Sequence, residues 1–160
     1  MSTFSEKINI FLQLKKIAIT GVSGTKPDAA NIIFRKLRDL GITTFPVNPN
    51  SKEVENTTCY PNLSSLPLLP EGVVIASPPQ SAKSIVEECL QLGIKHVWIH
   101  STIGNGSYNK EVVDYGEESG LSIIPTGCPM MFYKPVDFGH RCMKWIFNVS
   151  GKIPRVKGIY

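Results

Sequence analysis

A short segment of small and polar residues has the composition of a phosphate-binding turn. It follows an apolar run, and Pro27 after it favours the start of a helix. Its members are Gly21, Val22, Ser23, Gly24, Thr25 and Lys26. Small residues let backbone N–H groups approach a phosphate closely, and the amino end of a helix adds a positive dipole. The sequence therefore predicts that residues 21–26 hold phosphate.

The end of the next predicted strand indicates which phosphate ligand to expect. A protein that binds NAD usually places Asp or Glu there, where the carboxylate holds the ribose hydroxyls. The predicted strand 43–47 runs instead into NPNSK, residues 48–52, which contain no acid. A carboxylate would repel a phosphate on the ribose, whereas amides and a lysine attract one. We therefore expect coenzyme A or NADP, with Asn48 and Pro49 on the adenosine side and Lys52 at the ribose phosphate.

Apolar strands alternate with helical patterns along the chain. Strands are predicted at 16–20, 43–47, 72–77, 96–100 and 121–124, and helices between them at 27–40, 82–92 and 108–119. Residues 59–71, with three prolines, are expected to be loop with one short helical turn at most. The alternation predicts an α/β fold with a Rossmann-like, doubly wound, parallel five-stranded sheet. Its simplest strand order is 3-2-1-4-5.

Length and composition favour one domain that binds a small molecule. The chain has 160 residues, of which 42% are hydrophobic, enough for one core. We expect a single domain over residues 1–160, with its core at 16–131, an N-terminal helix at 4–15 and a C-terminal helix at about 137–149. The mild net charge of +4 and the absence of a long apolar run predict no nucleic-acid or membrane partner. The polar start lacks a signal-peptide pattern, so we expect a cytoplasmic protein.

In a parallel sheet the ligand lies at the carboxyl ends of the strands, which adds two further turns to the candidate site. Ser77, Pro78 and Pro79 follow the third strand and form a stiff corner suited to flank a flexible pantetheine arm. The turn after the fourth strand begins at Ser101.

His and Cys residues near these turns leave other chemistry open. His100, at the end of the fourth strand, could shuttle protons, but no carboxylate or nucleophile accompanies it in the sequence. Cys59 and Cys128 lie in turns from which a thiol could pair with CoA, although an isolated cysteine is more often a small apolar residue. The four cysteines have no metal-ligand spacing, so no metal is expected.

Five motifs in a fixed order resemble the standalone CoA-binding protein family and the CoA-binding N-terminal domain of the succinyl-CoA synthetase alpha subunit. They are TGVSG (20–24), VNP (47–49), CYPNL (59–63), SPP (77–79) and GIKHVW (93–98). The resemblance covers roughly residues 16–131, and its specificity lies in the ordered set. It implies a Rossmann-like domain that holds the nucleotide end of CoA.

The resemblance assigns functional residues position by position. Residues 23–26 match the first CoA-contacting turn of the ligases, and Lys52 stands where they place a lysine. Ser101, Thr102 and Ile103 fall at the turn after the fourth strand, which also contacts CoA in that family. The ligases have an acid and a glycine where this chain has Thr102 and Ile103, which makes this match the weakest.

The ligases also need a further domain with a phosphorylatable histidine and a separate nucleotide-binding subunit, and no such segment follows in these 160 residues. We therefore expect CoA or acyl-CoA binding without catalysis. Two alternatives stay open: an enzyme that uses NADP or processes acyl-CoA, and an interaction module whose basic C-terminal helix contacts a partner. A homo-oligomer or a protein partner is compatible with all three.

Overall fold

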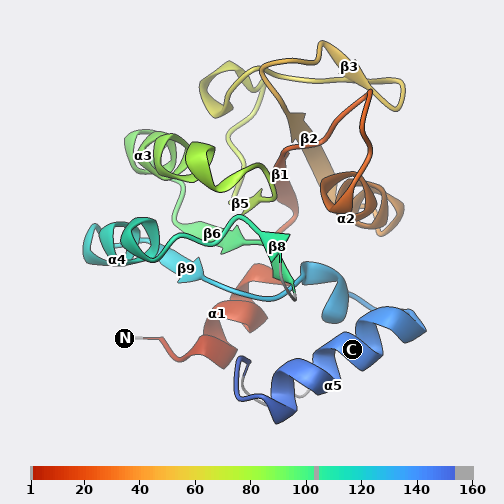
Figure 1. Ribbon diagram of the computed structural model, residues 1–160. Coiled ribbons are helices and arrows are strands. Elements are labelled where there is room, and N and C mark those ends of the chain that lie inside the picture. The colour runs from red at the N-terminus through yellow and green to blue at the C-terminus, as the bar shows by residue number, and fades with distance from the viewer. Residues whose placement is uncertain (1, 103–104, 154–160) are drawn as a thin grey trace.

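Five parallel strands form the centre of the computed structural model, which describes residues 2–102 and 105–153 (Figure 1). They are β1 (Lys16–Thr20), β2 (Thr43–Val47), β5 (Gly72–Ile75), β6 (His96–Ile99) and β9 (Ser122–Ile124). Nearly every residue of β1, β5 and β6 is buried, as expected for strands covered on both faces. The predicted α/β, Rossmann-like fold with a parallel five-stranded sheet is confirmed.

The strand order differs from the predicted 3-2-1-4-5. The sheet runs β2-β1-β5-β6-β9, so the third of its strands lies beside the first and the second is at the edge. Pro46 explains the difference, because its carbonyl points outward and accepts from the Tyr60 N–H at 3.0 Å. Proline has no N–H to donate on that side, so a full strand there would lose a ladder bond. Among the described residues, the β pairing at this edge is limited to an isolated bridge between Val47 and Tyr60.

Helices cover both faces of the sheet (Figure 1). α1 (Phe4–Phe11), α2 (Ala29–Asp39) and α5 (Phe138–Val149) lie on one face, and α3 (Ala82–Leu92) and α4 (Lys110–Glu118) lie on the other. The predicted helices at 82–92 and 137–149 therefore form. The N-terminal helix ends at Phe11 rather than at residue 15, because Leu12–Leu14 turn into β1.

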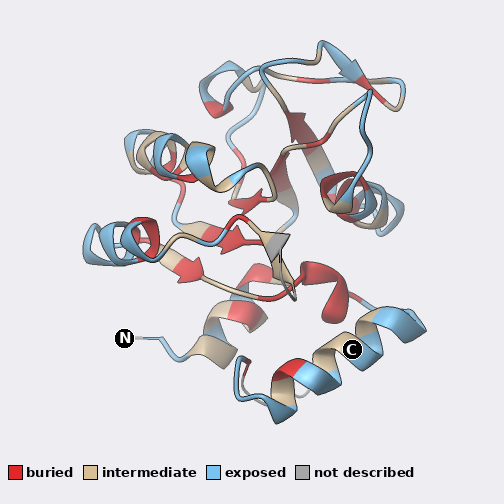
Figure 2. Ribbon diagram, viewed as in Figure 1, coloured by how far each residue is buried: buried red, intermediate tan, exposed pale blue. Residues whose placement is uncertain are grey.

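Two apolar clusters, one on each face, hold these layers together, and Figure 2 shows their buried residues along the strands. Trp98 of β6 is fully buried and meets Phe11 edge to face at 5.3 Å between ring centroids. Its ring also lies against Phe132, and its indole N–H donates to the Gly127 carbonyl at 3.2 Å. This contact fixes the chain after β9 to the sheet.

Short elements fill the connections. Two hairpins, β3 (Glu53–Val54) with β4 (Thr57–Thr58) and β7 (Ser101–Thr102) with β8 (Asn105–Gly106), were not predicted. Three 3-10 turns are η1 (Leu63–Ser65), η2 (Pro79–Ser81) and η3 (Pro129–Met131). The prediction of a loop with one helical turn at 59–71 is confirmed by η1. Within the residues that can be described, no helix is long and apolar enough to cross a membrane.

Candidate functional site

The turns after β1, β2 and β5 enclose a crevice of about 580 Å³ at the carboxyl ends of the strands. This is where the chain reverses direction across the sheet, since β2 and β5 leave β1 on opposite sides. The lining residues include Thr20, Gly21, Ser23, Lys26, Asp28, Asn48, Pro49, Ser77 and Pro78, with Asn62, Leu63, Ile85 and Glu88 on the α3 side.

Gly21 brings the first turn against the third. Its φ is +89°, and a Cβ built there would lie 2.8 Å from both the Ala76 carbonyl oxygen and the Ser77 nitrogen. Its N–H donates to the Val47 carbonyl at 3.0 Å, which ties it to the end of β2 as well. Glycine is therefore required at the point where the three turns converge.

Ser23 and Asn31 give the turn at residues 21–26 its shape. The Ser23 hydroxyl accepts hydrogen bonds from the N–H groups of Thr25 and Lys26, at 3.2 and 3.0 Å. The Asn31 side chain accepts from the Ser23 N–H at 3.0 Å and donates to the Ser23 carbonyl at 2.9 Å. The Gly24 N–H has no hydrogen-bond partner among the described residues.

Asn48 joins the second turn to the first. Its Nδ2 donates to the Val22 carbonyl at 2.9 Å, and its Oδ1 accepts from the Asn50 N–H at 2.9 Å. Val22 itself is fully buried, so it contributes its backbone and not its side chain to this wall. The interaction fixes the distance between the turn predicted for phosphate and the one predicted for adenosine.

Hydroxyl groups form the third wall of the crevice. The Ser77 hydroxyl lies 3.0 Å from the Thr20 hydroxyl and accepts a hydrogen bond from Ser81 at 2.8 Å. Opposite them, the Glu88 carboxylate accepts the N–H groups of Leu63 and Ser64 at 3.1 and 2.7 Å. Glu88 therefore holds η1 against α3 and closes that side of the crevice.

The structure brings together about half of the predicted site residues. The crevice is lined by Gly21, Ser23, Lys26, Asn48, Pro49, Ser77 and Pro78. Outside its lining are Val22, Gly24, Thr25, Lys52, Pro79, Ser101 and Thr102, of which Pro79 and Thr102 line an adjoining cavity. Lys52 is exposed, directly before the β3–β4 hairpin. Ile103 falls outside the described residues.

Three functional residues escaped the sequence analysis. Asn31 is 1% exposed on the buried face of α2, among apolar residues, and this polar exception is a signal that a helical projection shows. Asp28 caps the amino end of α2 by accepting from the Ala30 N–H at 2.9 Å, and it also lines the crevice. Glu88 carries no sequence signal, because its partners lie about 25 residues away.

Neither cysteine in the predicted turns is placed for thiol chemistry with a ligand. Cys59 and Cys128 are buried, and neither lines the crevice. Burial raises the pKa of Cys59, and it raises that of Cys128 to about 12. Both thiols are therefore protonated at neutral pH, whereas disulfide exchange needs a thiolate. The part of the chain that can be described holds no group of residues that could bind a metal.

Burial lowers the pKa of both His96 and His100, which gives the fold a pH dependence. At His100, Asp28 opposes this effect and His140 adds to it; at His96, Lys95 adds to it. Below about pH 6.5 the unfolded chain binds protons at these rings that the folded protein does not. The free energy of unfolding therefore decreases as the pH is lowered. We expect a slope of up to about 1.4 kcal/mol per pH unit for each histidine, measured by urea unfolding at pH 7.5, 6.5 and 5.5.

The carboxyl groups act in a lower pH range. The Lys15 N–H lowers the pKa of Glu71, and the His140 N–H lowers that of Asp137. Both ionised carboxylates therefore stabilise the fold at neutral pH, and this contribution is lost only as the pH falls below about 4, the usual carboxyl pKa. The variant His100→Gln should therefore reduce the slope of unfolding free energy against pH between pH 7.5 and 5.5, leaving the share of His96. It should not change the loss of stability below about pH 4. Equal stability of the native sequence at pH 7.5 and 5.5 would contradict the prediction.

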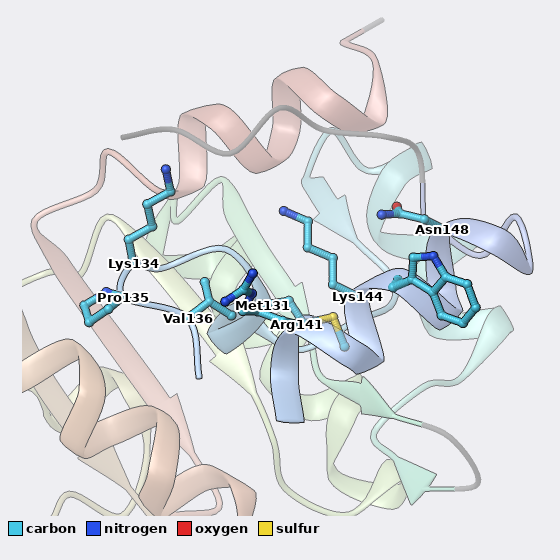
Figure 3. A pocket seen from close by; sticks show the side chains of 8 residues that line it. Met131, Lys134, Pro135, Val136, Arg141, Lys144 and Asn148 are labelled. Atoms are coloured by element: carbon cyan, nitrogen blue, oxygen red, sulfur yellow. The ribbon is translucent and has the colours of Figure 1, made fainter. Parts of the chain in front are cut away.

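A cavity of about 510 Å³ lies away from the crevice, between residues 131–136 and α5 (Figure 3). Lys134, Arg141 and Lys144 line it together with the exposed ring of Trp145. Lys144 lies over the Phe132 ring at 4.5 Å. None of the residues predicted for phosphate or CoA contributes to this cavity, so the crevice remains the candidate site.

The sheet order, the glycine turn at the point of reversal and the crevice at the strand ends define a domain of the Rossmann-like class, in which nucleotides commonly bind at the strand ends. Residues 15–134 match the family model described as CoA binding domain. The chain belongs to this family, which confirms the family resemblance found in the sequence.

Relatives of known activity are much longer than this chain. The acetate–CoA ligase (ADP-forming) I of Archaeoglobus fulgidus is 25% identical over 71% of this chain and 18% of its own length. The alpha subunit of acetate–CoA ligase (ADP-forming) II of Pyrococcus furiosus is 26% identical over 76% of this chain and 28% of its own length. The chain thus spans less than a third of the length of these curated relatives.

A solved structure of similar size supports the fold. A hypothetical protein from Pyrococcus horikoshii is 32% identical, with a TM-score of 0.71 over 81% of this chain and 88% of its own length. This chain therefore resembles both a short segment of the much longer ligases and nearly the whole of the small Pyrococcus horikoshii protein.

Proposed function

We propose that this protein binds CoA or acyl-CoA in the crevice through the phosphates and acts as a carrier or sensor without catalysis of its own. Residues 21–26 hold the pyrophosphate, Asn48 and Pro49 contact the adenosine, and the Ser77–Pro78 corner flanks the pantetheine arm. Lys52 meets the ribose phosphate from the rim. Membership of the CoA-binding domain family supports the choice of ligand.

One observation carries the proposal: the turns singled out for phosphate, adenosine and pantetheine converge on one crevice around Gly21. Lys26 is the one lysine or arginine among the described residues that line it. Asp28 and Glu88 also line it, but both carboxylates already accept backbone N–H groups. Each carboxylate is held by the backbone but keeps its negative charge, so Lys26 is the side chain of the described lining whose charge attracts an incoming phosphate.

Replacing Lys26 with alanine should weaken CoA binding by about tenfold, the effect of losing a hydrogen bond between charged groups. Because Lys26 is assigned to the pyrophosphate, dephospho-CoA should lose as much affinity as CoA. Lys52→Ala should instead weaken CoA alone and so remove the preference for CoA over dephospho-CoA. Calorimetric titration with both ligands measures these differences.

Lys83→Ala is the matched control, since Lys83 is an exposed lysine outside the crevice and its loss should leave both affinities unchanged. Binding of NADPH in preference to CoA would favour the NADP-dependent enzyme instead. Failure of the native protein to bind either CoA or dephospho-CoA would refute the proposal.

A further inference from the structure

A second cavity of about 360 Å³ adjoins the crevice at the Ser77–Pro78 corner. It shares Asp28, Ser77 and Pro78 with the crevice, so the two hollows meet along these residues. Ala29, the first residue of α2, and His100 also line it. A pantetheine arm that passes the corner would bring its sulfur end to this cavity.

His100 gives the second cavity its chemical character. The residue is 6% exposed, and its Nε2 is buried with no hydrogen-bond partner among the described residues. Its backbone is fixed on both sides, because its N–H donates to the Ile75 carbonyl and its own carbonyl accepts from the Ser107 N–H. Buried polar atoms without partners are uncommon in folded proteins. Of the four among the described residues, this is the one whose residue lines the second cavity, where a ligand could supply the partner.

We propose, on the basis of the CoA binding proposed above, that the second cavity receives the group carried on the sulfur of CoA and selects uncharged acyl groups. The carbonyl oxygen of the thioester accepts a hydrogen bond from His100 Nε2. Free CoA has no carbonyl at this position and leaves the imidazole without a partner.

Charge explains why the acyl group must be uncharged. Burial keeps His100 neutral at pH 7, so it offers a hydrogen bond but no positive charge. Asp28 lies close enough to influence the titration of His100, and no lysine or arginine is among the described residues that line the second cavity. An acyl chain that ends in a carboxylate would therefore face Asp28 without compensation.

Titration of the native protein with CoA, acetyl-CoA and succinyl-CoA tests the proposal. Acetyl-CoA should bind about three- to tenfold more tightly than CoA, the effect of one net hydrogen bond, and succinyl-CoA more weakly than acetyl-CoA. The imidazole ¹⁵N signal of His100 should move on addition of acetyl-CoA and not of CoA. Both measurements use the unaltered chain and do not depend on how a variant folds.

Variants then assign the preference to the side chain. His100→Leu should bring the affinity ratio of acetyl-CoA to CoA to about one and leave the affinity for CoA itself within about twofold. His100→Gln, which keeps an N–H near the Nε2 position, should retain part of the ratio. His96→Leu is the matched control, because His96 is the first residue of β6, whereas His100 follows the last, and His96 lines neither cavity.

The outcomes separate this proposal from the one on which it rests. If CoA binds and acetyl-CoA binds no more tightly, or if His100→Leu weakens both ligands equally, acyl selection by His100 is wrong and CoA binding stands. If neither ligand binds the native protein, the proposed function fails first, and the inference fails with it.

Discussion

Gly21→Ala should destabilise the protein by about 2–4 kcal/mol and abolish CoA binding. An L-residue at this φ of +89° carries a backbone cost of about 1 kcal/mol, and the clash of the new methyl group adds about 1–3 kcal/mol. The atoms it meets, at 2.8 Å, belong to the backbone of Ala76 and Ser77 and cannot move aside as a flexible side chain would. Relief of the clash would part the first turn from the third and open the crevice.

Gly41→Ala isolates the clash from the backbone cost. Gly41 has a similar φ of +78°, but nothing lies within 4 Å of a Cβ built there. Urea unfolding should show a loss of about 1 kcal/mol for Gly41→Ala, with CoA affinity unchanged. If the two variants are equally stable and both bind CoA, the close approach at Gly21 does not shape the crevice.

Asn31→Leu should cost about 3 kcal/mol of stability and weaken CoA binding at the same time. The substitution leaves the Ser23 N–H and carbonyl without their partner, and unsatisfied buried groups cost about 1–3 kcal/mol each. It also removes the hydrogen bond from Asn31 to Glu55, although Glu55 keeps its ion pair with Arg35 at 2.8 Å. The turn at 23–26 would lose the side chain that holds it in place.

A half-buried asparagine on another helix provides the comparison. Asn9 of α1 has a buried Oδ1 that finds no hydrogen-bond partner in the described part of the chain, so Asn9→Leu should change the free energy of unfolding by less than about 1 kcal/mol. Asn9 lies on α1 and does not line the crevice, so the substitution should leave the CoA affinity unchanged. Equal effects of the two variants on stability and binding would show that Asn31 has no special connection to the turn.

The strands could be predicted because each is an apolar run bounded by Gly, Pro or polar residues. The strand 43–47 was predicted at its observed bounds for this reason. The order of the strands was wrong because the alternation of strands and helices does not specify on which side of β1 the chain returns. Pro46 was the sequence signal for the correct order, since a proline within a strand indicates an edge strand and β2 lies at the edge.

The candidate site was predicted in part because turns at the carboxyl ends of parallel strands must meet. This rule places Gly21, Asn48 and Ser77 on one crevice. It does not find Asn31 or Glu88, whose side chains reach the turns from helices, nor does it say that Lys52 stands outside the lining. Such placements depend on side-chain packing between distant segments, which local patterns do not encode.

The hydroxyl of Ser23 already occupies the two amides that a phosphate would seek. In the proposed binding mode, a phosphate oxygen would take the place of this hydroxyl, so one acceptor would replace another. The loop would then need little rearrangement, and little ordering entropy would oppose binding or release of the ligand. A domain of this kind would suit a carrier that releases its ligand as readily as it binds it.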